Sequence, residues 1–149
     1  MRQFITFSDR EVTKQELDMI YDDFKKIEIQ YGIPQVERKR YNVTATIDET
    51  VIGMASGLTH HNKWFYLSDL WVNENYRNKG LGAKLLKMLE DKIKSIGIKH
   101  IYTFTTAFNS NEVFYEKQGY KQCFVFEDYF EVKNGHHVCL RKDLQVSVV

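Results

Sequence analysis

The segment Arg77-Asn78-Lys79-Gly80-Leu81-Gly82 has the residue types of an anion-binding loop. It lies between a run of aromatic and aliphatic residues and the start of an amphipathic helical pattern. The first amides of a helix have no intrahelical partner and the helix dipole makes that end positive, so these amides can bind phosphate oxygens. Gly80 and Gly82 have no side chains to keep a phosphate away, and Arg77 and Lys79 add positive charge. The loop therefore predicts a phosphate site, with a tight turn that binds no ligand as the alternative.

Two common phosphate-binding motifs do not fit this loop. The dinucleotide-binding fingerprint needs a third glycine three residues after the second, and this chain has Leu85 there. It also needs an acidic residue about 20 residues further on, where the sequence reads His100-Ile101-Tyr102. The nucleotide P-loop needs Gly-Lys-Ser/Thr after four spacer residues, and the sequence does not contain it. Neither motif is predicted.

The hydrophobic pattern predicts strands and helices that would position this loop. Thr13 and Glu16 have the spacing of a capping box that begins a helix, and Gly97 ends the helix that follows the loop. Strands that alternate with helices predict a single α/β (α+β) domain with a mixed sheet over residues 1–149. Its tail at 145–149 either extends a sheet edge or frays. The buried stripe of the helix after the loop should be Leu81, Leu85, Leu89, Ile93 and Ile96. A period of two at 41–47 and further apolar runs predict strands at 3–7, 41–47, 51–58, 63–72, 100–108, 120–126 and 137–142. Helices are predicted at 13–27, 80–96 and 111–117.

The composition excludes several classes of function. The 149 residues carry 21 Lys and Arg against 20 Asp and Glu, which argues against a protein that binds nucleic acid through bulk charge. The two cysteines, Cys123 and Cys139, predict neither a disulfide framework nor a metal site, and we expect both to be buried. No apolar run approaches the roughly 20 residues that span a bilayer. We therefore expect a cytoplasmic protein with no membrane, nucleic-acid or metal partner.

Three motifs occur in a characteristic order and spacing. They are Leu70-Trp71-Val72, Arg77-x-x-Gly80-x-Gly82 and Phe114-Tyr115-Glu116-Lys117-x-Gly119-Tyr120. Together they resemble the GNAT superfamily of N-acetyltransferases, in which an Arg/Gln-x-x-Gly-x-Gly/Ala loop binds acetyl-CoA. The resemblance covers residues 43–144. It implies a mixed, mostly antiparallel sheet flanked by helices, with a splay between the two central strands at 63–72 and 100–108.

The resemblance implies acetyl-CoA as co-substrate and assigns its binding largely to the main chain. The loop backbone would bind the pyrophosphate, and the end of the preceding strand would pair with the pantetheine amides. A backbone amide near Trp71 would stabilise the tetrahedral oxyanion. An asparagine that leads the short helix would cap it and touch coenzyme A. The residues expected to contact the co-substrate are Leu70, Trp71, Val72, Arg77, Asn78, Lys79, Gly80, Leu81, Gly82, Asn109, Asn111 and Tyr115.

The same resemblance suggests two catalytic residues, Tyr115 and Asp69. Tyr115 matches the family's tyrosine, whose hydroxyl donates a proton to the leaving thiolate. Related enzymes place a glutamate nine residues before the motif arginine, and this chain has Ser68 there. The neighbouring Asp69 is then a candidate base, since burial in an apolar strand raises the pKa of a carboxylate, with lining the substrate pocket as the alternative. Imidazoles titrate near neutral pH, so further candidates are His60, His61, His136 and His137.

The implied activity is transfer of the acetyl group of acetyl-CoA to a primary amine of a small molecule, by direct attack in a ternary complex. Because Ser68 replaces the family glutamate, a module that binds acyl-CoA without catalysis is an alternative, as is an acceptor at a protein N-terminus or lysine. Acceptor specificity should come from the N-terminal helix, from residues 32–39 and from residues 127–135. In the last segment Asp128, Tyr129 and Phe130 are typical of a pocket or an interface. Similar proteins pair through their C-terminal strands, so a homodimer is also compatible with the resemblance.

Overall fold

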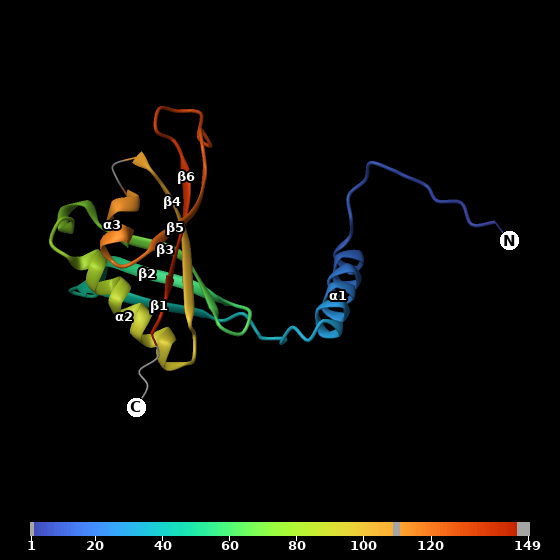
Figure 1. Ribbon diagram of the computed structural model, residues 1–149, viewed down its shortest axis with the longest axis horizontal. Coiled ribbons are helices and arrows are strands. Elements are labelled where there is room, and N and C mark those ends of the chain that lie inside the picture. The colour runs from blue at the N-terminus through green and yellow to red at the C-terminus, as the bar shows by residue number, and fades with distance from the viewer. Residues whose placement is uncertain (1, 109–110, 146–149) are drawn as a thin grey trace. The chain divides into compact units, whose positions relative to one another are not determined.

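The computed structural model describes residues 2–108 and 111–145 (Figure 1). Its internal contacts separate residues 1–35 from residues 36–149 as two units. That residues 1–149 form a single domain stays a prediction. No helix within the described ranges has both the length and the apolar character needed to cross a membrane.

The first unit contains one helix, α1 (Lys14–Gln30). Thr13 begins it with the predicted capping box: its Oγ1 accepts from the Glu16 amide at 3.2 Å, and the Glu16 carboxylate accepts from the Thr13 amide at 3.0 Å. Gly32 follows the helix with a φ of 75°. The strand predicted at 3–7 is wrong. A strand needs a hydrogen-bonded neighbour, and the described residues of this unit contain no other strand.

The second unit is built on one mixed sheet. Its elements are β1 (Arg40–Ile47), β2 (Thr50–His60), β3 (Trp64–Val72), the 3-10 helix η1 (Glu74–Tyr76), α2 (Leu81–Ser95), β4 (His100–Thr106), α3 (Asn111–Lys117), β5 (Lys121–Phe126) and β6 (His137–Asp143). The strands lie in the order β1-β2-β3-β4-β6-β5, and only β3 and β4 are parallel. The mixed, mostly antiparallel sheet is therefore confirmed.

The hairpin between β1 and β2 turns through two residues. Asp48 and Glu49 have φ values of 47° and 67°, which is the left-handed backbone of a two-residue turn that matches the twist of a hairpin. The predicted hairpin is confirmed, although β2 runs two residues beyond its predicted end. β4 ends at Thr106, two residues before its predicted end.

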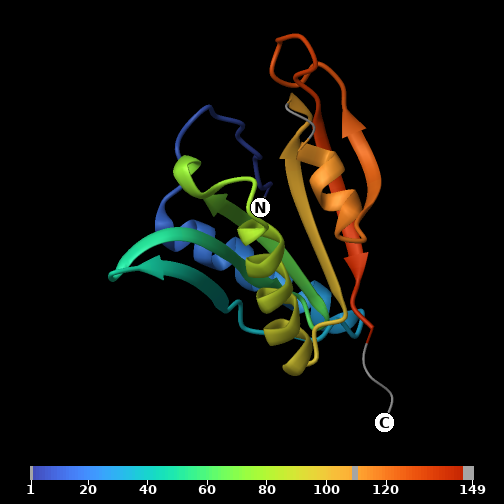
Figure 2. The same ribbon diagram turned by 90° about the vertical axis from the view of Figure 1, so that its left-hand side faces the viewer.

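The two central strands are paired over only part of their length. Parallel pairing runs from Trp64 opposite His100 to Leu67 opposite Thr103 and then stops. At the same level the register between β2 and β3 skips Ser68, and such a bulge bends a strand. Figure 2 shows β3 and β4 diverging from this end of the pairing. The predicted splay between the central strands is confirmed.

Helices α2 and α3 pack on one face of the sheet (Figure 2). Ile96, which was expected in the buried stripe of α2, is 48% exposed because the helix ends at Ser95 and the next residue leaves the helical path. The residues of α2 that are buried are Leu85, Leu86, Leu89, Glu90 and Ile93. The core they join includes the largest buried side chains of the strands, which are Phe65, Leu67, Ile101 and Leu140.

A buried carboxylate links α2 to the far strands of the sheet. Glu90 is 4% exposed, and both of its oxygens are satisfied. The Tyr120 hydroxyl donates to Oε2 at 2.9 Å, and Lys142 Nζ donates to Oε1 at 2.8 Å. Burial and the Glu90 charge raise the pKa of Tyr120 well above its ordinary value, so its hydroxyl stays a donor. The charge of Glu90 is tolerated in the core because of these two partners.

Replacing Glu90 should destabilise the fold. We expect Glu90→Ala to lower the free energy of unfolding by about 3 kcal/mol, because Lys142 and Tyr120 lose their buried partner. Denaturant unfolding of both proteins measures the difference. Lys87→Ala, nearby on the same helix, is the control: it removes an ion pair with Asp91 at 2.6 Å that is exposed on both sides, and stability should not change. Equal losses in the two variants would contradict a special role for the buried pair.

The fold should also lose stability at alkaline pH. Burial raises the pKa of Tyr115 to about 12, whereas an unfolded tyrosine ionises near pH 10. The stabilisation is present below pH 10 and is lost as the pH rises toward 12, because the folded chain holds a proton that the unfolded chain releases. We expect a loss on the order of 2 kcal/mol from this residue. Unfolding curves at stepped pH should show a smaller loss for Tyr115→Phe than for the unchanged chain, and the idea fails if the two losses are equal.

Candidate functional site

The loop that precedes α2 leaves the first amides of the helix without a side-chain cap. Gly80 is the N-cap residue, and its φ of 80° is left-handed. Asn78 is also left-handed, with a φ of 60°, so the chain turns twice between η1 and the helix. Glycine has no side chain that could accept from the helix amides, and a Cβ built on Gly80 would meet nothing within 4 Å. The amides at the start of α2 therefore remain available to an acceptor such as a phosphate.

Arg77 ties this loop to the end of β3. Its Nε donates to the Val72 carbonyl at 2.8 Å, so the side chain positions the loop and does not merely add charge at its rim. Gly82 lies where α2 meets β3 and α3, since a Cβ there would be 3.6 Å from the Phe114 ring and 3.8 Å from Val72. The predicted loop, the end of β3 and the start of α3 are therefore brought together.

The backbone of β3 carries groups that β4 does not pair. The Asn73 amide donates to the Ile52 carbonyl of β2 at 2.8 Å, and residues of an antiparallel ladder alternate between facing the neighbour and facing away. Trp71 therefore turns its backbone groups toward β2. Leu70 and Val72 turn theirs toward the side from which β4 has parted. Two of the three strand residues expected to contact the co-substrate thus present their backbone to the splay, and the amide of Trp71 does not.

Tyr115 lies beside the point where β3 and β4 part. It belongs to α3, and its side chain is buried in the core. Its ring lies edge-on to that of Tyr120, with 5.5 Å between the ring centroids. Burial raises the pKa of Tyr115 to about 12, and the neighbouring Thr103 side chain offsets part of the rise. Thr103 is in the last parallel pair, and its Oγ1 donates to the Leu67 carbonyl at 2.9 Å. The phenol is therefore protonated at neutral pH and could donate a proton at the splay.

Asp69 is exposed, so the burial expected for this candidate base is wrong. Leu70 packs against the core, which turns its neighbour Asp69 toward the face opposite α2 and α3. The Ser68 hydroxyl donates to Asp69 Oδ2 at 2.6 Å. Arg40 Nη1 in turn donates to Ser68 Oγ at 3.2 Å and to Ser56 Oγ at 2.8 Å. The carboxylate is thus a solvated group with a hydroxyl partner and a guanidinium nearby.

The paired end of β3 and β4 holds one pair of candidate histidines. His60 lies opposite Trp64, at the end of β3 where parallel pairing begins, and His61 follows in the turn. The Tyr102 hydroxyl and His60 Nδ1 are 3.0 Å apart. Burial and the neighbouring His61 lower the pKa of His60, which favours a neutral ring. Neither imidazole lies at the splay.

The other two candidate histidines lie where β6 begins. His136 Nδ1 accepts from the Asp128 amide at 3.0 Å, a contact that holds the β5–β6 connection. His137 lies opposite Thr106, on the part of β4 that has diverged from β3. Of the four histidines, His137 is the one whose strand position faces the diverged part of β4.

The remaining predicted residues have different outcomes. Asn109 lies outside the described residues, as does the tail at 146–149, and Asn111 is the exposed first residue of α3.

Cys139 is buried as expected, and burial raises its pKa to about 11. Cys123 is exposed, so its expected burial is wrong; it occupies an irregularity in the pairing of β5 with β6. Within residues 2–108 and 111–145, no three His, Cys, Asp or Glu side chains are grouped as a metal site requires.

Two residues near the splay were not predicted from the sequence. Thr103 is 3% exposed and lies on the core face of a strand that alternates with Ile101, so a polar residue in an apolar position was the available signal. Arg40 begins β1 and reaches the β3 bulge from two strands away. Nothing in the local sequence of an exposed arginine marks such a contact.

Comparison with known proteins agrees with this arrangement. A model of the acetyltransferase (GNAT) family matches residues 6–120. The D-amino-acid N-acetyltransferase of Saccharomyces cerevisiae is 33% identical over 76 residues, which are 47% of this chain and 47% of that protein. The chain therefore spans about half of the length of this curated relative.

Solved structures show the same fold over most of the chain. An acetyltransferase from Bacillus cereus has a TM-score of 0.74 and 25% identity, with 93% of this chain and 98% of that chain covered. An aminoglycoside 6'-N-acetyltransferase complexed with coenzyme A has a TM-score of 0.64 and 18% identity, with 89% of each chain covered. At that identity the second likeness concerns the fold alone. Because the family model covers well over half of its residues, this chain belongs to the acetyltransferase (GNAT) family.

Proposed function

We propose that the chain is an acetyl-CoA-dependent N-acetyltransferase that acts on a primary amine of a small molecule by direct attack in a ternary complex. One observation carries this proposal: the parallel pairing of β3 and β4 ends beside a buried, protonated tyrosine. An uncapped helix start lies at the end of the same strand β3. Family membership and the yeast relative, named as a D-amino-acid N-acetyltransferase, support an acetyl transfer to a small amine.

The available backbone groups fit the two ends of acetyl-CoA. The first amides of α2, which no side chain caps, would bind the pyrophosphate. The Leu70 carbonyl and the Val72 amide, which β4 does not pair, would bond with the amide groups of pantetheine. When bound, the thioester supplies an acyl carbon that an amine can attack and a thiolate that can leave.

The chain's own residues would then supply a charge partner and a proton. The Leu70 amide points into the splay and would stabilise the oxyanion of the tetrahedral intermediate, a part first expected of an amide near Trp71. Tyr115 would give its proton to the leaving thiolate, which its raised pKa allows because the phenol stays neutral. The attacking amine must lose a proton, and Asp69 would receive it through solvent, since its carboxylate is exposed on the face opposite the helices.

Replacing Gly80 tests the phosphate site. We expect Gly80→Ala to weaken coenzyme A binding at least about tenfold, because a Cβ at φ 80° strains the turn that presents the helix amides. Gly97→Ala is a matched control at the other end of α2, where φ is 95° and a Cβ also meets nothing within 4 Å. It should lower stability by a similar amount and leave the dissociation constant for coenzyme A unchanged. Titration calorimetry measures this constant for the two variants. If both variants bind coenzyme A equally weakly, the loop at Gly80 is not the phosphate site.

Replacing Tyr115 tests the chemistry. We expect Tyr115→Phe to lower turnover about 100-fold, because the leaving thiolate loses its proton donor, and to leave coenzyme A affinity unchanged. Tyr120→Phe removes the hydroxyl of the neighbouring buried ring, which points to Glu90, and should destabilise the protein without lowering turnover in this way. Thiol release with a panel of amines measures both.

The outcomes of these assays separate the possible functions. A loss of less than about threefold in Tyr115→Phe would exclude the acid role. Coenzyme A binding without thiol release from any amine would favour a non-catalytic acyl-CoA-binding module. Thiol release with peptides alone would favour an acceptor at a protein N-terminus or lysine.

A further inference from the structure

Three flat rings form a stack on the diverged side of the splay. His137 lies parallel to Phe104, with ring centroids 5.0 Å apart and planes 10° apart. On the same imidazole, Tyr129 stacks at 4.8 Å with planes 21° apart. Phe104 directly follows Thr103 of the last parallel pair, and His137 lies opposite Thr106 further along β4. The stack therefore begins where the strands part and continues away from that point along β4 and β6.

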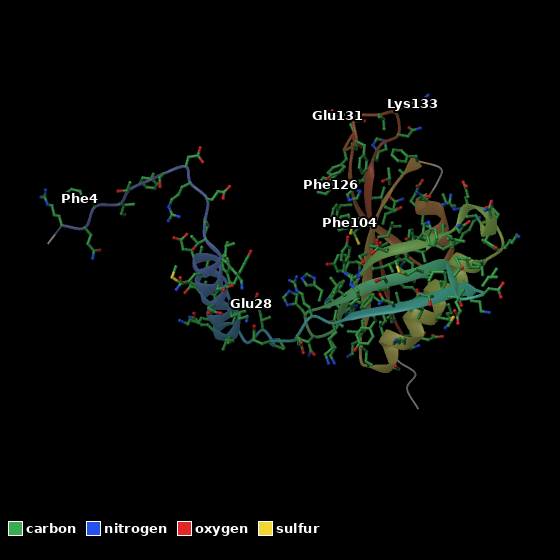
Figure 3. The ribbon with its side chains drawn as sticks, turned by 180° about the vertical axis from the view of Figure 1, so that it is seen from behind. Phe4, Glu28, Phe104, Phe126, Glu131 and Lys133 are labelled. Carbon is green, nitrogen blue, oxygen red and sulfur yellow. The ribbon has the colours of Figure 1, made fainter. Side chains whose placement is uncertain are left out.

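More aromatic rings surround this stack. Phe130 meets His137 edge-on at 5.7 Å, and Phe126 lies 6.1 Å from Tyr129. Tyr129 is 57% exposed, Phe126 51% and Phe130 40%, which is unusual for so many rings close together. Figure 3 shows Phe104 and Phe126 near one another on the sheet. We call the set Phe104, Phe126, Tyr129, Phe130 and His137 the aromatic wall.

The ring of His137 is held by stacking and not by polar contacts. Its Nδ1 is buried and has no hydrogen-bond partner among the residues that the structure describes. A base would need a ring nitrogen positioned by a partner, whereas this imidazole mainly offers a flat surface between two others. His137 therefore belongs to the wall as an aromatic ring.

The diverged part of β3 carries a carboxylate, Asp69, with the Arg40 guanidinium nearby. Within β3, β4, β5 and β6 the acidic residues are Asp69 and Asp143. Asp143 is engaged by Arg141 and by His100, each at 2.7 Å, near the paired end of the sheet. Asp69 is thus the carboxylate of these strands that lies on the diverged part of β3. Figure 3 places Glu131 and Lys133 at the tip of the β5–β6 connection, beyond Phe104 and Phe126.

We propose that the acceptor is a primary amine attached to a flat aromatic group, with the amine toward Asp69 and the aromatic group on the aromatic wall. This inference rests on the proposed function and adds the class of acceptor. The Asp69 carboxylate suits the ammonium group of such an amine. Rings that stack or meet edge-on bind another ring more strongly than an aliphatic group of equal size.

The test compares amines that differ only in their apolar group. Phenethylamine, its saturated counterpart cyclohexylethylamine, and spermidine are assayed by thiol release with acetyl-CoA. We expect kcat/KM for phenethylamine to exceed that for cyclohexylethylamine about fivefold, and that for spermidine by more. Equal values for the two matched amines, or a preference for spermidine, would overturn the proposal.

Two variants at Tyr129 separate the ring from its hydroxyl. Tyr129→Phe keeps the ring and should keep the preference for phenethylamine. Tyr129→Leu should reduce that preference to within about twofold, mainly through a higher KM. Coenzyme A binding by each variant reports folding. If Tyr129→Leu does not bind coenzyme A, the proposal is judged only from the kcat/KM values of the unchanged chain for phenethylamine and cyclohexylethylamine.

Other outcomes assign the wall differently. If the unchanged chain binds no coenzyme A, the proposed function itself fails. If amines are acetylated without any aromatic preference, only this inference fails. A drop in the mass of the assembly in solution for Tyr129→Leu, with amine preference unchanged, would assign the wall to contact with a second copy and would overturn the acceptor site.

Discussion

The hydrogen bond from the Thr103 hydroxyl to the Leu67 carbonyl makes the splay between β3 and β4 possible. When two paired strands part, a carbonyl at the last pair loses its backbone donor, and a buried carbonyl without a partner is costly. Thr103 supplies that donor from its side chain, so the strands can separate within the core. The same side chain lowers the raised pKa of Tyr115 in part. One threonine therefore ends the ladder beside the proposed acid.

Helix α2, which begins the proposed phosphate site, is fixed both at its start and in its middle. At its start, Arg77 binds the loop to the Val72 carbonyl. Further along, the buried Glu90 joins the helix to Tyr120 before β5 and to Lys142 of β6. A helix that is fixed at two points keeps its first amides directed at one place, which is the preorganisation that binding to backbone donors requires.

Much of this arrangement was predictable because local sequence determines it. A glycine loop that opens a helix and a Thr-Glu capping box each have a local physical cause, and both occur as predicted at Gly80 and Thr13. The misses depend on distant residues. Residues 3–7 are rich in apolar side chains but have no neighbouring strand among the described residues of their unit, and Asp69 is turned outward by the packing of Leu70. Glu90 gave no sign of burial, because its two partners come from elements that follow it in the chain.

Because β3 offers main-chain groups at Leu70 and Val72, recognition there does not depend on which side chains those residues carry. Their side chains have a separate task, since both pack against the core. Any apolar residue of suitable volume could serve at these positions without altering what the strand recognises. If the proposed sites are occupied as described, acceptor specificity can change on the face opposite the helices without any change in the backbone that binds the acyl donor.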